Sequence, residues 1–199
     1  MNSAAIAFAY EPPNGAATRI ERGGSHRITS PDRARLNALV NAALEFKIAP
    51  NARLVVLDAE PQTLDRTARA ALRSRIGFLP ANGGLISNLN GWENAALPLG
   101  FHQPQRLPDI ALPLLRLLDT LVGGARALLA KLPEDMTVLE RKAIGFARAL
   151  LLAPELLIVE DFARGLEPAE RPRIDDFIAA YHEACAGGTL LQIDHHVSS

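Results

Sequence analysis

The spacing of apolar residues over 143–168 predicts a helix that leads into a buried strand. Apolar residues recur at helical spacing until Pro154, which ends the pattern. The continuous apolar run at 156–159 is typical of a strand buried on both faces of a parallel sheet. Glu160 and Asp161 follow this run directly, so we expect both carboxylates at the carboxyl edge of the sheet, where α/β proteins place their chemistry.

Apolar alternation and turn residues predict the remaining elements of an α/β fold. We expect an edge strand over Ala4–Tyr10, a second strand region over Arg19–Ile28 interrupted at Gly23 and Gly24, and strands over Arg53–Asp58 and Ile76–Leu79. Helices are expected over Pro31–Leu44, Leu64–Arg75, Pro108–Leu121 and Ala125–Leu132. Ser30 is the expected N-cap of the first of these helices, because Pro31 suits a first helical turn.

Composition narrows the class of protein. A chain of 199 residues that is 48% hydrophobic is long enough for one α/β domain with a sizeable core. Its 21 basic and 22 acidic residues give a net charge of -1, which offers no electrostatic basis for binding nucleic acid or a lipid surface. A single cysteine, Cys185, and the lack of an apolar run of about 20 residues lead us to expect a cytoplasmic protein without direct membrane insertion.

The segments GFARAL, PELLIVEDF and GLEP resemble the stretch of ABC-transporter ATPases that runs from the signature helix through the Walker B strand to the D-loop. The resemblance implies a P-loop NTPase fold of the ABC type over residues 1–199, with a parallel-sheet core and a helical subdomain inserted at 82–142. The order of the two acids is inverted: Glu160 stands in the slot of the magnesium-orienting aspartate, and Asp161 in that of the catalytic glutamate. His195 falls on the slot of the switch histidine. These three are the candidate catalytic residues, although carboxylates at strand ends are commonly only capping or solvated groups.

The nucleotide-binding motifs of that family are absent. The phosphate-loop position reads RITSPDRARL, and the lysine slot falls on Asp32 or Arg33. Phosphate cradling needs glycines and backbone N–H groups, whereas Pro31 removes a donor and an aspartate repels phosphate. The glutamine slot holds Ala81, whose methyl group can neither donate nor accept a hydrogen bond, and Asn82 lies one position away.

The signature slot is also altered. Residues 136–140 read MTVLE, in which Thr137 keeps a hydroxyl but Val138 and Leu139 replace glycines and Glu140 adds negative charge. We therefore expect no cofactor and no bound metal; ATP with magnesium is expected only if the chain is an active ATPase with an atypical phosphate loop.

Residues 84–99 resemble a leucine-rich WEN-ALPL segment of the ATPases of Mla/MCE-type lipid transporters. In that family the segment opens the helical subdomain, which receives a helix of the transmembrane subunit. The resemblance implies partner binding by Leu89, Trp92, Glu93 and Leu97, although a lone tryptophan is more often simply part of a core.

Three functions are compatible with this sequence. The leading hypothesis is a non-catalytic pseudo-ATPase subunit that docks on the inner-membrane permease of a lipid or solvent-tolerance transporter, at the cytoplasmic face. The alternatives are an active ABC ATPase and a soluble regulatory protein with the same fold. The resemblance also implies a homodimer or a heterodimer with another ABC subunit.

Overall fold

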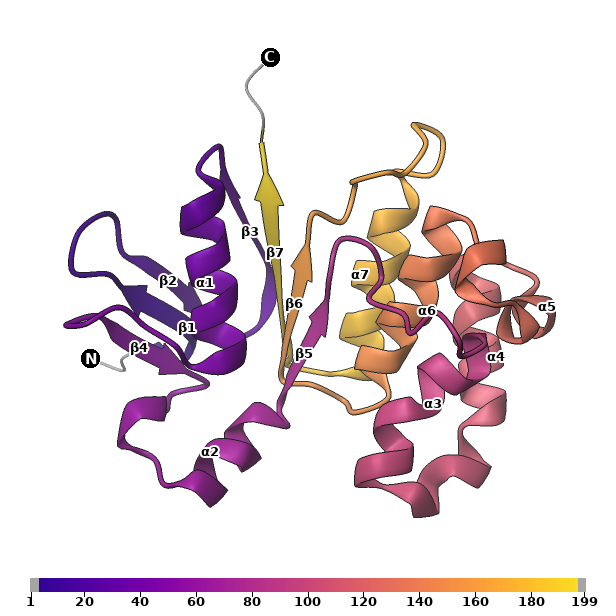
Figure 1. The fold of residues 1–199 in the computed structure, drawn as a ribbon, viewed down its shortest axis with the longest axis horizontal. Coiled ribbons are helices and arrows are strands. Elements are labelled where there is room, and N and C mark those ends of the chain that lie inside the picture. The colour runs from indigo at the N-terminus through magenta and orange to yellow at the C-terminus, as the bar shows by residue number, and fades with distance from the viewer. Residues whose placement is uncertain (1–3, 197–199) are drawn as a thin grey trace.

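The computed structural model describes residues 4–196, which form two sheets with helices around them (Figure 1). The first sheet is antiparallel, with strand order β2-β1-β4. Its strands are β1 (Ile6–Glu11), β2 (Thr18–Glu21) and β4 (Arg53–Val56). β1 lies between the other two, with Phe8 opposite both Ile20 and Val56. The expectation of an edge strand here was wrong, because β1 pairs with β2 on one side and with β4 on the other.

The second sheet is parallel, with strand order β3-β7-β6-β5. It consists of β3 (Gly24–Ser30), β5 (Ile76–Leu79), β6 (Leu156–Glu160) and β7 (Thr189–His195). The predicted strand at 156–159 is confirmed, and its four apolar side chains are almost completely buried. The predicted break lies at Arg22 and Gly23, and Gly24 is already the first residue of β3; at this break the chain passes from one sheet to the other.

Two apolar cores lie on opposite faces of the parallel sheet. Leu156 and Ile158 face the core that contains α1 (Arg33–Glu45) and the antiparallel sheet. Leu157 and Val159 face the core that contains the later helices. Figure 1 shows this division, with α1 on one side of the parallel sheet and α3 to α7 on the other. Alternate side chains of one strand thus join two cores, which explains the continuous apolar run.

The helices after α1 are α2 (Arg66–Arg73), α3 (Gly91–His102), α4 (Ala111–Leu121), α5 (Ala125–Ala130), α6 (Val138–Leu150) and α7 (Arg173–Ala184). Short 3₁₀ segments occupy Pro61–Thr63, Pro104–Asp109 and Pro133–Asp135. The amphipathic pattern predicted over Pro108–Leu121 is confirmed for α4, whose Leu114, Leu118 and Leu121 are buried. Within residues 4–196, no helix combines the length and apolar composition needed to cross a membrane.

A glycine in the middle of α6 allows a close contact that positions the edge of the parallel sheet. A side chain at Gly145 would collide with the carbonyl oxygen of Gly83 and come within 2.8 Å of Leu79 Cδ1. Gly145 therefore lets the loop after β5 lie directly on α6.

Candidate functional site

The carboxyl ends of three parallel strands bring the predicted catalytic residues together. Glu160 is the last residue of β6 and pairs in register with Ile193 of β7. Ser30, the last residue of β3, pairs with His195 at the end of β7. Glu160, Asp161 and His195 therefore lie near the N-terminus of α1, as expected from the parallel arrangement.

The connection from β3 to α1 contains only two residues, Pro31 and Asp32. The Asp32 carboxylate accepts a hydrogen bond from the backbone N–H of Arg35 at 3.1 Å and is the N-cap of α1. The prediction of Ser30 as the N-cap was wrong, because Ser30 still belongs to β3; its hydroxyl instead accepts from the Asp32 N–H at 3.1 Å. The helix N-terminus that would attract an anion is thus already capped by a carboxylate of the chain itself.

Two cavities lie at this edge. A pocket of about 580 Å³ opens beside the loop after β5 and is lined by Pro80, Ala81, Asn82, Val138, Arg141, Glu160, Arg164 and Gly165. The cavity between α1, β6 and β7 measures about 10 Å³ and is lined by Arg33, Leu36, Asn37, Glu160, Asp161, Ile193 and His195. This volume corresponds to about one water molecule. Sites for drug-sized ligands measure roughly 300–1,000 Å³. The cavity at the phosphate-loop position is therefore too small for a phosphate group, whereas the pocket beside Glu160 has the volume of a small-molecule site.

Asp161 and His195 are held by hydrogen bonds to the backbone. Asp161 Oδ1 accepts from the His195 N–H at 2.6 Å, and its side chain is only 11% exposed. Asp161 also has a positive φ of 41°, and its Oδ2 lies 3.8 Å from Arg164. The His195 ring donates from Nε2 to the carbonyl oxygen of Pro31 at 3.2 Å. These contacts tie β6, β7 and the β3–α1 connection together, so both groups brace the edge of the sheet.

The residues at the signature slot, 136–140, include the N-terminal cap of α6. The Thr137 hydroxyl accepts from the Glu140 N–H at 3.2 Å, and the Glu140 carboxylate accepts from the Thr137 N–H at 2.8 Å. Glu140 is also 2.7 Å from Lys131 Nζ. This reciprocal capping box satisfies the N–H groups of Thr137 and Glu140, two of the backbone donors at the start of α6.

A buried lysine that was not predicted from the sequence, Lys142, forms a hydrogen bond with Ala81 at the glutamine slot. Lys142 is fully buried on α6, and its Nζ donates to the carbonyl oxygens of Ala81 at 2.5 Å and Asp161 at 3.4 Å. Nζ also lies 5.6 Å from the centre of the Phe162 ring. Burial lowers the pKa of Lys142 from 10.5 to about 8, although Asp161 acts in the opposite direction. Lys142 thus connects the glutamine slot to Asp161, the residue that follows β6.

The other polar groups of this loop also make local contacts. Asn82 Oδ1 accepts from the Gly84 N–H at 3.0 Å. Arg148 donates to the carbonyl oxygens of Gly84 at 2.8 Å and Gly83 at 3.2 Å. Burial lowers the pKa of Arg148. Two basic residues of α6, Lys142 and Arg148, therefore hold the loop that follows β5.

The predicted partner-binding residues lie around the start of α3. Trp92 is half-buried and packs against two apolar clusters, and Leu89 and Leu97 are also partly buried. Glu93 is exposed, but its carboxylate accepts from the Asn90 N–H at 2.8 Å in a second capping box. Asn94 was missed: its buried amide binds both backbone groups of Ile86 and the carbonyl oxygen of Leu89.

Exposed apolar side chains flank this segment. Ile86 is 41% exposed before α3, and Phe101 is 79% exposed near its end. Neither stood out in the sequence, because an apolar residue in a helical pattern is ordinarily assigned to the buried face. Among the residues that the structure describes, no group of three or more His, Cys, Asp or Glu side chains is placed to bind a metal ion.

Solved structures with the same fold were found by comparison. A cbiO1 structure from Clostridium perfringens, part of the ABC transporter complex cbiONQ, superposes with a TM-score of 0.77 over 96% of this chain and 79% of that chain, at 17% identity. The dimeric ABC transporter cassette MJ0796 gives a TM-score of 0.74 over 95% of this chain and 88% of that chain, also at 17% identity. The chain therefore has the ABC ATPase fold with its parallel sheet and helical elements, as predicted.

Curated proteins with similar sequences are ATP-binding proteins of import systems. The methionine import ATP-binding protein MetN of Cupriavidus necator is 27% identical over 161 residues, covering 81% of this chain and 46% of MetN. The phosphonates import ATP-binding protein PhnC 1 of Pseudomonas syringae pv. tomato is 33% identical over 165 residues, covering 75% of this chain and 58% of PhnC 1. The chain thus spans about half the length of these curated relatives. No protein-family model matches it.

This chain is thus similar in sequence to ATP-binding proteins of import systems and similar in fold to ABC transporter cassettes. This is the general part of the resemblance read from GFARAL, PELLIVEDF and GLEP. The narrower likeness to Mla/MCE-type ATPases stays a prediction.

Proposed function

We propose that this chain is a non-catalytic subunit of an ABC transporter, a pseudo-ATPase that uses the fold without binding nucleotide. The observation that carries the proposal is the two-residue connection between β3 and α1, in which the Asp32 carboxylate caps the helix. A phosphate group here would meet an aspartate where the family has glycines and a lysine. The adjoining cavity of about 10 Å³ leaves no room for it.

The closed signature slot extends this proposal to dimers. In the family, two subunits pair head to tail, so that the phosphate loop of one faces the signature of the other. Here both halves are altered, by Asp32 in the first and by the Thr137–Glu140 capping box in the second. A homodimer would contain no competent site, and a heterodimer with an active subunit would contain no complete one.

An active ATPase is the second candidate function. It is favoured by the position of Glu160, Asp161 and His195 at one edge of the sheet and by the ATP-binding function named for the relatives. Against it, Asp161 and His195 are engaged with backbone groups. Measurable binding of Mg-ATP separates this candidate from the other two.

The proposed partner is a transmembrane permease subunit at the cytoplasmic face of the inner membrane, and the proposed cargo is a lipid or a solvent molecule. The cargo rests on the WEN-ALPL resemblance alone. The docking surface we propose surrounds α3 and includes Leu89, Trp92, Glu93 and Leu97. Exposed Ile86 and Phe101 add apolar area on which a helix of the permease can pack. A soluble regulatory role, the third candidate, requires no such partner.

Co-purification from solubilised membranes tests the docking surface. A tagged wild-type chain is expected to recover a membrane subunit, and Ile86→Asp and Phe101→Asp to lose most of it while circular dichroism stays unchanged. Leu112→Asp is the matched control, because Leu112 is 57% exposed but belongs to α4 and not to the segment around α3. Glu93→Gln removes the charge yet keeps an oxygen that can cap Asn90, so it tests electrostatics without loss of the helix cap. Full recovery with both aspartate variants would place the docking surface elsewhere.

A further inference from the structure

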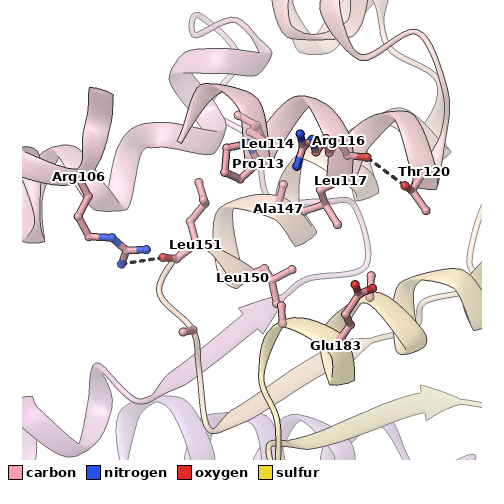
Figure 2. Close-up of a pocket in the computed structure, with 13 residues that line it drawn as sticks. Arg106, Pro113, Leu114, Arg116, Leu117, Thr120, Ala147, Leu150, Leu151 and Glu183 are labelled. Atoms are coloured by element: carbon pink, nitrogen blue, oxygen red, sulfur yellow. Dashed lines mark hydrogen bonds between the residues drawn. The ribbon is translucent and has the colours of Figure 1, made fainter. Parts of the chain in front are cut away.

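A pocket of about 520 Å³ lies away from the carboxyl edge of the sheet, among the 3₁₀ segment Pro104–Asp109, α4, the end of α6 and α7 (Figure 2). Its volume falls within the range of small-molecule sites. Its lining includes Leu114, Ala147 and Leu150, which are almost completely buried within the later-helix core. The pocket therefore has a rigid apolar floor formed by elements that are distant in sequence.

Two positive side chains and one negative side chain line the pocket around this floor. Arg106, Arg116 and Glu183 line the pocket. Figure 2 places Arg106 beside Leu151, across the pocket from Glu183. Neither arginine forms a salt bridge with any residue in the described part of the chain. The charge of the lining is thus net positive, with Arg106 at the end away from Glu183 and Arg116 on α4.

The Arg106 guanidinium is positioned by contacts from one of its nitrogens. Nη1 donates to Gln103 Oε1 at 2.7 Å and to the carbonyl oxygen of Leu151 at 3.3 Å. Nε and Nη2 make no hydrogen bond to any residue that the structure describes. Arg106 is exposed, so Nε and Nη2 are accessible to a carboxylate, while Glu183 disfavours a second acidic group at the far end.

We propose that this pocket binds a small amphipathic carboxylate, with its apolar body on the floor formed by Leu114, Ala147 and Leu150 and its acidic group at Arg106. The proposal needs neither nucleotide nor permease and is independent of the proposed function. It assigns a ligand-binding role to a region that lies outside the altered nucleotide motifs.

Three probes that share a ten-carbon alkyl chain but differ in head group test the proposal on the full chain by calorimetry, at concentrations where each is monomeric in solution. Decanoate is expected to bind most tightly, decanol more weakly, and decyltrimethylammonium most weakly. Arg106→Gln should weaken decanoate about fivefold, to the affinity of decanol, whereas Arg126→Gln should change nothing because Arg126 does not line this pocket. Equal affinity for the carboxylate and the ammonium probe would overturn the proposal.

A filling variant locates the binding. Ala184→Trp places a large side chain at the pocket from an exposed position near the end of α7, so folding should be retained. It should abolish decanoate binding, whereas Ala179→Trp, exposed on the same helix but outside the lining, should not. Undiminished binding by a folded Ala184→Trp protein would contradict the assignment. If the wild type forms a concentration-dependent dimer that Ala184→Trp disrupts, the pocket is a dimer interface and the assignment is also contradicted.

Discussion

Replacing Lys142 by methionine should change how the stability of the protein depends on pH. Lys142 is fully buried, and its only hydrogen-bond acceptors among described residues are the carbonyl oxygens of Ala81 and Asp161. Asp161, Glu160 and Asp194 favour its charge and Arg164 opposes it, but burial dominates and lowers its pKa from 10.5 to about 8. The folded protein therefore holds the Lys142 proton less strongly than the unfolded chain does.

The sign and size of the effect follow from this difference. Below pH 8 both states are protonated, and the folded state bears the full cost of a buried charge. Between pH 8 and 10.5 the unfolded chain binds the additional proton, so the Lys142 contribution to folding stability rises with pH by at most about 1.4 kcal/mol per pH unit. The full change from pH 7 to above 10.5 is about 3 kcal/mol, from the displacement of the pKa.

Urea unfolding of the wild type and Lys142→Met between pH 7 and 10 measures this contribution as the difference between their free energies of unfolding. We expect the methionine variant to be close to the wild type at pH 7, because relief of a buried charge offsets two unpaired carbonyl oxygens. Its deficit should grow by about 2–3 kcal/mol by pH 10. Lys47→Met is the control, because the side chain of Lys47 is 78% exposed. A difference that stays flat with pH for Lys142→Met would refute the reasoning.

Two further substitutions test the local geometry. Asp32→Ala should lower the free energy of unfolding by about 1 kcal/mol in urea titrations, because it removes the N-cap of α1. Asp32→Asn should retain most of the stability, because asparagine can also cap a helix. Equal losses in the two variants would argue against the cap. Gly145→Ala should lower the free energy of unfolding by about 3 kcal/mol or more in the same assay, because its methyl group would collide with the Gly83 backbone. The comparison is Ala143→Gly on the same helix, which should cost about 1 kcal/mol. A stable Gly145→Ala protein would mean that the loop can move away.

Some features of the fold could be predicted from local pattern. β5 and β6 were predicted closely because each is a short apolar run bounded by polar or turn residues. The role of β1 could not be predicted locally, since its central place depends on pairing with β4, more than 40 residues later. The N-cap of α1 was misplaced for a similar reason: pairing with His195 extends β3 to Ser30 and moves the helix start onward.

The candidate site could also be predicted only in part. The gathering of Glu160, Asp161 and His195 follows from parallel strands, so sequence pattern sufficed. Their engagement with backbone groups depends on distances that a sequence does not contain. Lys142 was missed because a lysine in an amphipathic helix normally reaches solvent; only the packing of α6 on the sheet reveals that it is buried. The Asn90–Glu93 cap has the spacing of a capping box but was not predicted, because Glu93 was assigned to partner binding.

Calorimetric titration of the purified chain with Mg-ATP tests the central claim most directly. Because Asp32 caps α1 and the adjoining cavity holds about one water molecule, we expect no saturable heat of binding up to millimolar nucleotide. Asp32→Lys should likewise not bind, since the two-residue connection would remain. Micromolar affinity for Mg-ATP that is lost in a folded Asp161→Asn variant would contradict the assignment of this chain as a pseudo-ATPase.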